Sequence, residues 1–152
     1  MTNSADSRNV RPADLVRALE LAARLIHSRS HARGLYPAQW SALRYFKSAL
    51  GEYRTAIGLA RYQGLAFGPV ARTVRTLIDR GYLRKAGSAG RGRAEIVELT
   101  ALGEESLARD PLAPLALTVA DLNPAVRAAV AVALEPIIAA LADAGEADEP
   151  LS

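Results

Sequence analysis

Residues 55–81 read TAIGLARYQGLAFGPVARTVRTLIDRG, and this stretch decides the fold. It predicts a short helix over residues 55–62 and a longer helix over residues 67–80, separated by the turn QGLA at 63–66. Gly81 stands where a glycine commonly ends a helix, because glycine adopts the left-handed backbone at low cost. The stretch therefore predicts two helices joined by a tight turn.

The longer of these two helices has two different faces. Successive residues of a helix turn by about 100°, so Val70, Val74 and Leu77 fall within about 60° of one another, and we expect them to pack on a core. The opposite face carries small, polar and charged residues: Gly68, Arg72, Arg75, Thr76 and Asp79. One face is thus expected to hold the helix in place while the other faces solvent.

Two short strands are expected after this helix, at residues 82–86 and 94–99, with a glycine-rich connection at 87–93. The second strand alternates, with Ile96 pointing opposite to Val97. Two helices, a tight turn and then a hairpin with a basic loop form a winged helix-turn-helix. The second helix of such a unit is slim enough to enter a major groove, and the hairpin loop can reach a neighbouring minor groove. We therefore expect a mainly α fold with a small β-hairpin wing.

Upstream of this unit, proline and glycine mark two further helices. Pro12 fits the first turn of a helix whose apolar residues step by three and four, and Gly34 is expected to end that helix. Pro37 opens the next helix and Gly51 closes it. The buried face of this second helix should be Trp40, Leu43, Phe46 or the aliphatic stem of Lys47, and Leu50.

Downstream, Thr100 is expected to cap a helix that runs to about residue 109. Pro111 and Pro114 bracket a break, and a last helix is expected to start with Asn123 as its cap and a proline at its first position. Pro136 lies inside that last helix and should kink or locally break it.

The first and last helices carry apolar stripes wider than one lobe needs, which indicates that they form a homodimer. We divide the chain into a flexible tail 1–10, an N-terminal dimerisation helix 11–33, a winged helix-turn-helix lobe 34–109, C-terminal dimerisation helices 110–142 and an acidic tail 143–152.

The charge of the chain is unevenly distributed. Residues 54–93 contain nine basic side chains and one acidic side chain, Asp79, so the segment carries +8. The remainder carries −5, which leaves the net charge of +3. A basic middle segment inside an otherwise acidic chain is the electrostatic pattern expected for binding a polyanion, although a solvated basic face would give the same count.

The spacing Leu59-Ala60-(x)3-Gly64-Leu65-(x)4-Val70-(x)3-Val74-(x)2-Leu77-(x)3-Gly81-x-Leu83 resembles the helix-turn-helix of the MarR family of transcriptional regulators. Arg93, followed by Leu99-Thr100-(x)2-Gly103, is similar to the wing arginine of that family and its closing Leu-Thr-x-x-Gly. The segment LYPAQW at 35–40 and Leu43 resemble the start of the family's second helix. The resemblance covers roughly residues 12–107.

The resemblance implies a homodimeric regulator that binds a pseudo-palindromic operator in double-stranded DNA, acts as a repressor and releases DNA when a small-molecule effector binds. The expected DNA-binding residues are Phe67, Gly68, Pro69, Arg72, Arg75, Thr76, Arg91 and Arg93. The resemblance also suggests an effector pocket formed by Tyr36, Trp40 and Tyr45, although Trp40 as a plain core aromatic is the alternative.

The chain departs from the family pattern at two places. Arg91 stands where many members have an aspartate two residues before the wing arginine, so Arg93 lacks that partner. The start of the recognition helix reads AFGP at 66–69 in place of a run of serine and threonine. Base reading is therefore expected to shift towards apolar contact and towards Arg72, Arg75 and Thr76.

Other chemistries find little support in the sequence. His27 and His31 have the i, i+4 spacing of a helical metal site, but no third ligand is apparent near them, and we expect no metal and no cofactor. No nucleophile–base set or clustered acid pair is visible, so we expect no enzymatic activity. The chain has no cysteine, its N-terminus lacks the apolar core of a signal peptide, and no uncharged apolar run reaches the roughly 18 to 20 residues of a membrane span.

We therefore expect a cytoplasmic protein without a membrane partner. Two alternatives remain open. One is a winged-helix protein–protein interaction module without DNA binding, and the other is a small helical enzyme or carrier.

Overall fold

The computed structural model describes residues 9–89, 92 and 94–146. The elements follow in the order α1 (Pro12–Arg29), α2 (Pro37–Ser48), the 3₁₀ turn η1 (Gly51–Tyr53), α3 (Ala56–Gln63), α4 (Phe67–Asp79), β1 (Leu83–Ala89), β2 (Ala94–Leu99), α5 (Ala101–Leu107), α6 (Ala113–Ala120) and α7 (Pro124–Glu146). The fold is mainly helical with one two-stranded antiparallel hairpin, as the sequence predicts.

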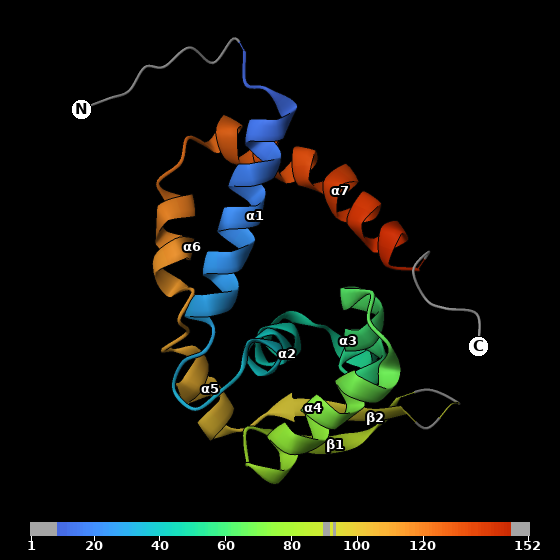
Figure 1. The fold of residues 1–152 in the computed structure, drawn as a ribbon. Coiled ribbons are helices and arrows are strands. Elements are labelled where there is room, and N and C mark those ends of the chain that lie inside the picture. The colour runs from blue at the N-terminus through green and yellow to red at the C-terminus, as the bar shows by residue number, and fades with distance from the viewer. Residues whose placement is uncertain (1–8, 90–91, 93, 147–152) are drawn as a thin grey trace.

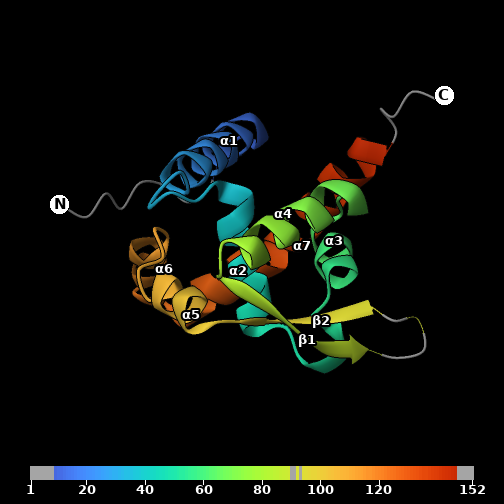
Figure 2. The same ribbon diagram turned by 90° about the horizontal axis from the view of Figure 1, so that it is seen from below.

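The elements form a lobe and a separate group of flanking helices. In Figure 1, α1, α6 and α7 occupy the upper part of the molecule, whereas α4 and the β1–β2 hairpin lie at the bottom with α2 and α3 between them. Figure 2, seen from below, shows α4 and the hairpin nearest the viewer. The predicted wing and second helix of the helix-turn-helix thus form one end of the protomer.

The hydrophobic core lies entirely within the lobe. Its buried apolar residues are Leu35, Trp40, Ala42, Leu43, Phe46, Leu59, Ala60, Val70, Val74, Leu77, Leu83 and Val97. Trp40 and Leu43 of α2 are fully buried, as is Leu77 of α4. The burial of such apolar side chains is the largest favourable contribution to the folding of the lobe.

The second helix is shorter than the sequence predicts. It ends at Ser48, and η1 follows it, so Gly51 does not close a helix but takes a positive φ of 49° at the start of the 3₁₀ turn. Leu50 was expected in the core and is 75% exposed, because it lies beyond the helix whose periodicity placed it inside. That expectation was wrong.

The other boundaries differ in smaller ways. The first helix ends at Arg29 with Ser30 as its cap residue, before the predicted stop at Gly34. Residues 113–120, for which no helix was predicted, form α6 with Pro114 of the expected break in its first turn. Helix α7 continues through Pro136 without being broken.

The hairpin is antiparallel, with Leu83 opposite Leu99, and its register shifts between Lys85 and Ser88. Gly87 lies in this irregular stretch with φ of 117°, a backbone conformation that few residues other than glycine adopt. The N–H of Val97 donates to the carbonyl of Arg54 at 2.8 Å and so ties β2 to the end of η1. The wing is therefore anchored on the lobe along its second strand.

The junction between the wing and α5 explains the Leu-Thr-x-x-Gly motif physically. The hydroxyl of Thr100 accepts a hydrogen bond from the N–H of Gly103 and caps α5. A Cβ at Gly103 would lie 2.3 Å from the carbonyl oxygen of Tyr82, so only glycine lets α5 approach the strand β1 this closely.

Neither α1 nor α6 has a buried residue, and no residue of α7 whose side chain is described is buried, although Arg127, Leu134 and Ile137 are half-buried. In the described residues, the segment Pro124–Asp143 of α7 is the one helix long and apolar enough to cross a membrane, judged by length and composition alone. The segment includes Arg127 and Glu135, so it is not an uncharged run.

Candidate nucleic-acid interface

The turn between α3 and α4 sets the angle of the helix that presents the candidate interface. Gly64 ends α3 in the left-handed conformation, with φ of 63° and ψ of 35°. The N–H of Leu65 donates to the carbonyl of Ala60 at 3.0 Å, which satisfies one of the last carbonyls of α3. At its other end α3 is capped by Thr55, whose hydroxyl accepts from the N–H of Gly58 at 3.0 Å.

Helix α4 has the two faces that its sequence predicts. Val70, Val74 and Leu77 are buried against the core. The residues expected to face DNA, namely Phe67, Gly68, Pro69, Arg72, Arg75 and Thr76, are all exposed. Within the described residues, neither Arg72 nor Arg75 forms a hydrogen bond or ion pair through its side chain. Both guanidinium groups are therefore available to an external anion.

Several other basic side chains of the segment 54–93 already form hydrogen bonds or ion pairs within the protomer. The guanidinium of Arg80 donates to the carbonyl of Gly34 and lies over the ring of Tyr82. Arg84 pairs with Glu98 at 2.8 Å, and Lys85 pairs with Glu95 at 3.2 Å. The two glutamates lie just beyond the segment 54–93 in the sequence, so the charge of +8 overstates the positive charge that this region offers to a partner.

The wing arginines Arg91 and Arg93 lie outside the described residues. The role predicted for these two arginines stays a prediction.

A groove of about 540 Å³ lies between α4 and the hairpin, beside the region where the two elements pack together. Phe67, Arg75 and Asp79 line it from α4, while Lys85 and Glu95 line it from the strands. Arg75 therefore sits at the edge between the exposed face of α4 and this groove, whereas Arg72 does not line it.

The structure does not bring the three aromatic residues of the expected effector pocket together. Tyr36 is 66% exposed at the start of α2, where its ring meets the edge of His31. Trp40 is fully buried, and its Nε1 donates to the carbonyl of Ala32 at 3.2 Å. Tyr45 lies near the other end of α2, nine residues and roughly 13.5 Å along the helix from Tyr36 at 1.5 Å per residue.

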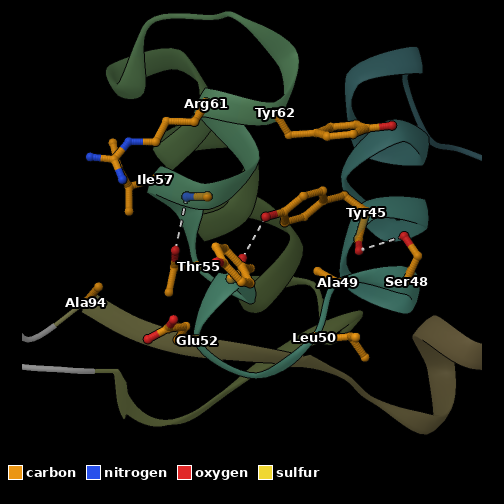
Figure 3. A pocket seen from close by; sticks show the side chains of 12 residues that line it. Tyr45, Ser48, Ala49, Leu50, Glu52, Thr55, Ile57, Arg61, Tyr62 and Ala94 are labelled. Atoms are coloured by element: carbon orange, nitrogen blue, oxygen red, sulfur yellow. Dashed lines mark hydrogen bonds between the residues drawn. The ribbon is translucent and has the colours of Figure 1, made fainter.

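Tyr45 instead lines a cavity of about 840 Å³ that the sequence did not predict (Figure 3). The cavity lies where the end of α2, η1, α3 and the first residue of β2 meet. The sequence offers no clear signal for this cavity, because its tyrosines Tyr45, Tyr53 and Tyr62 are spread over three elements and show no common periodicity.

The histidine pair on α1 is exposed, with the Nε2 atoms of His27 and His31 3.4 Å apart. No group of three potential metal ligands among His, Cys, Asp and Glu occurs in the part of the chain that the structure describes.

No family model matches the sequence, and no curated protein is similar enough to count as a relative. The fold, in contrast, matches solved structures over nearly their whole length. The transcriptional regulator PcaV from Streptomyces coelicolor, solved with its natural ligand, is 20% identical, with 91% of this chain and 99% of that chain covered and a TM-score of 0.62.

Two further structures show the same fold. A MarR/EmrR family transcriptional regulator from Acinetobacter sp. ADP1 is 18% identical over 88% of this chain and 97% of that chain, with a TM-score of 0.64. The regulator MosR of M. tuberculosis, solved in complex with DNA, is 23% identical over 91% of this chain and 98% of that chain, with a TM-score of 0.55. The chain thus has the winged-helix fold with flanking helices that is found in the MarR-family transcriptional regulators.

Proposed function

We propose that this protein is a sequence-specific regulator of transcription that binds double-stranded DNA as a homodimer through helix α4. The observation that carries the proposal is the division of α4 into two faces. Val70, Val74 and Leu77 fix the helix on the core, while Arg72 and Arg75 are exposed and unpaired among the described residues. Arginine is the side chain that most often reads guanine in the major groove.

The fold supports this role by analogy. MosR, which shares the fold, was solved in complex with DNA. Since the similarity is below 25% identity, the analogy concerns the placement of the helix and not the residues that read bases.

The test compares Arg72→Ala with wild type on a selected operator and on a random duplex at one fixed salt concentration. If Arg72 reads a guanine, binding to the operator should weaken by roughly 1–3 kcal/mol, with much less loss on random DNA. If Arg72 contacts phosphate, both affinities should fall together. Unchanged affinity on both duplexes in a folded variant would contradict the placement of α4 in DNA and favour a protein–protein interaction module.

A matched control is Arg109→Ala. Arg109 is exposed beyond the end of α5, its only ion pair among described residues is a 4.0 Å contact with Glu105, and its replacement changes the net charge by the same amount. This variant should bind both duplexes as wild type does, which separates a local contact from a general loss of positive charge.

The proposed dimer rests on the apolar faces of the flanking helices. Leu21 and Leu25 of α1 and Val130 and Leu141 of α7 are exposed in the protomer. A second copy that covers these faces in a two-fold arrangement would remove a large apolar patch from water. Light scattering at micromolar concentration should therefore give the mass of a dimer.

The alternative to a second copy is a membrane, because the segment Pro124–Asp143 of α7 has the length and composition of a membrane-spanning helix. Flotation with neutral lipid vesicles tests it. A dimer that stays in the soluble fraction supports the cytoplasmic regulator, whereas vesicle-bound protein would overturn it.

We further propose that the protein is a repressor that releases its operator when a small molecule binds. The support is the complex of PcaV with its natural ligand. A reporter gene behind the selected operator should be more active when the protein is deleted, and a reporter that loses activity would show an activator instead. We propose that the protein acts by binding DNA through the exposed face of α4 and not as an enzyme.

A further inference from the structure

The two histidines of the chain lie together where α1 ends. His27 is in the last turn of α1, and His31 follows the helix in the connection that leads to α2 (Figure 1). Both side chains are exposed, and their Nε2 atoms are 3.4 Å apart. The chain has no other histidine, so all of its imidazole groups meet at this one place on the surface.

The distance between the two Nε2 atoms fits a metal ion that both could bind. Zinc–nitrogen bonds are about 2.0–2.1 Å long, so two nitrogens at neighbouring corners of a tetrahedral zinc site lie about 3.3–3.4 Å apart. Two nitrogens at right angles around an ion with the same bond length would lie only about 2.8–3.0 Å apart. The observed separation of 3.4 Å is therefore the spacing of a tetrahedral site.

The backbone around His31 is held in place by the lobe. The hydroxyl of the buried Ser30 donates to a carbonyl in the last turn of α1 at 2.8 Å. One residue after His31, the carbonyl of Ala32 accepts a hydrogen bond from the Nε1 of the fully buried Trp40 at 3.2 Å. His31 thus approaches His27 from a fixed backbone, which lowers the entropic cost of holding a ligand between them.

Neighbouring groups orient the rings and influence the charge of the site. The rings of His27 and His31 meet edge to face with centroids 5.1 Å apart, and the ring of Tyr36 also meets His31 edge to face, at 5.9 Å. The partial negative charge at the C-terminus of α1 favours a cation beside its last turn. Arg24 and Arg29 are close in the sequence and oppose a cation, so we expect a moderate affinity.

The histidine pair lies away from the proposed dimer face of α1. Two positions along a helix correspond to a rotation of about 200°, so His27 projects from nearly the opposite side of α1 to Leu25. A second copy that covers the exposed Leu25 therefore leaves His27 open to solvent.

We infer that His27 and His31 form a binding site for a divalent transition metal, with Zn²⁺ as the ion whose geometry fits, held by the two Nε2 atoms and by water at the remaining positions. Imidazole is a ligand that zinc prefers, and histidines at i and i+4 of a helix are a recurrent pair of zinc ligands. No third protein ligand is required at an exposed pair, because water reaches the open positions. The bound ion would tie the last turn of α1 to the connection that enters α2, and this site does not depend on DNA binding.

Metal binding would change the protonation pattern of the two rings. Without metal, one Nε2–H donates to the other Nε2, since a neutral imidazole carries its proton on either ring nitrogen. In the zinc complex both Nε2 lone pairs face the ion, and both protons lie on Nδ1. Nitrogen NMR of the side chains distinguishes these two patterns. Because the chain has only two histidines, one substitution assigns both signals.

The test uses the full chain without an affinity tag, so that His27 and His31 are the only histidines in the sample. Calorimetry should show one zinc ion bound per chain at micromolar zinc chloride. Magnesium chloride should show no binding, because Mg²⁺ prefers oxygen ligands. Amide NMR shifts caused by zinc should centre on residues 26–36. No binding at millimolar zinc, shifts centred elsewhere, or one zinc ion shared by two chains would each overturn the inference.

Three variants sharpen the test. His27→Ala and His31→Ala should each weaken zinc binding by at least about tenfold, because each removes one of the two protein ligands. The matched control combines His27→Ala with Arg29→His, which keeps two imidazoles but places them two positions apart, where side chains do not face each other. This control should bind zinc no better than His27→Ala. If the control binds zinc as wild type does, or if either single variant keeps the affinity of wild type, the pair does not form the site.

Discussion

The lobe and the flanking helices use the same kinds of apolar residue in opposite ways. In the lobe, Leu43, Leu59 and Leu77 are almost completely buried by other elements of the same chain. In the flanking helices, Leu21 of α1 and Leu141 of α7 are exposed although both helices are as well formed as α4. An apolar stripe on a helix therefore indicates that another surface packs against the helix. It does not indicate whether that surface belongs to the same chain.

Polar contacts join the two regions. The guanidinium of Arg44 on α2 donates twice to the carboxylate of Asp110, at 2.7 Å each. The carboxylate of Asp110 also accepts from the N–H of Leu112 just before α6. The lobe is thus held to the segment that leads to α6 and α7 by charge-assisted hydrogen bonds and not by a continuous apolar core.

The largest expected effect is the loss of a core side chain in the lobe. Leu77→Ala should lower the free energy of unfolding by roughly 2–5 kcal/mol, because it leaves a cavity among fully buried side chains. Denaturant unfolding followed by circular dichroism measures this. The matched control is Leu21→Ala on α1, made in a variant that does not dimerise. There it should change the free energy of unfolding very little, because Leu21 is exposed in the protomer. An equal loss of stability in both variants would contradict the difference between the buried lobe and the exposed flanking helices.

The next effect concerns the flanking helices. Ile138 is 62% exposed in the protomer, so Ile138→Asp should leave the lobe folded. If a second copy covers α7, the buried charge should weaken dimerisation by roughly 2–4 kcal/mol. Analytical ultracentrifugation over a range of concentrations checks this, and wild type should also show a melting temperature that rises with concentration. If wild type is a monomer, the proposed dimer is wrong and a second copy does not cover the apolar face of α7.

A smaller effect is expected at the contact between the regions. Burial alone would raise the pKa of Asp110, but the hydrogen bonds from Arg44 and Leu112 and the charge of Arg44 outweigh it and lower that pKa below 3.8. Asp110→Asn should therefore lower the stability at pH 7 by about 1–3 kcal/mol.

The sign of the pH dependence follows from this lowered pKa. The stabilisation by the Asp110 carboxylate is present above the pKa of the unfolded state and is lost as the pH falls through the lower pKa of the folded state. The difference between wild type and Asp110→Asn should therefore shrink below about pH 4. A difference that stays constant from pH 7 to pH 3 would assign the effect to geometry instead of charge.

The smallest expected effect is on the stability of the protein when a residue of the proposed DNA-binding surface is replaced. Arg72→Ala removes an exposed side chain without a partner in the described residues, so the free energy of unfolding should change by no more than about 0.5 kcal/mol. Chemical denaturation of the variant beside wild type measures this. A loss of more than about 1 kcal/mol would place Arg72 in the scaffold and not on a free surface.

Local patterns predicted the lobe well where one element determines its own form. The turn at Gly64, the buried face Val70–Val74–Leu77 and the strand Ala94–Leu99 all appear as expected. The prediction failed at Leu50, because the helix periodicity was extended past the point where α2 ends. The sequence predicted a break between Pro111 and Pro114 and no helix before residue 123, although a proline in the first turn of a helix, as Pro114 is in α6, leaves the helix intact.

What the sequence by itself determined is the order α2, α3, α4, β1, β2 and α5, which makes the winged helix-turn-helix, and the exposed face of α4. These follow from backbone conformations and from apolar spacing within single elements, which are local properties of the chain. Only the tertiary structure decided which charges remain free and where a cavity opens. Arg80, Arg84 and Lys85 find partners that lie 10 to 46 residues away. The cavity joins residues from Tyr45 to Ala94, and no pattern along the chain can reveal a volume that exists only between elements.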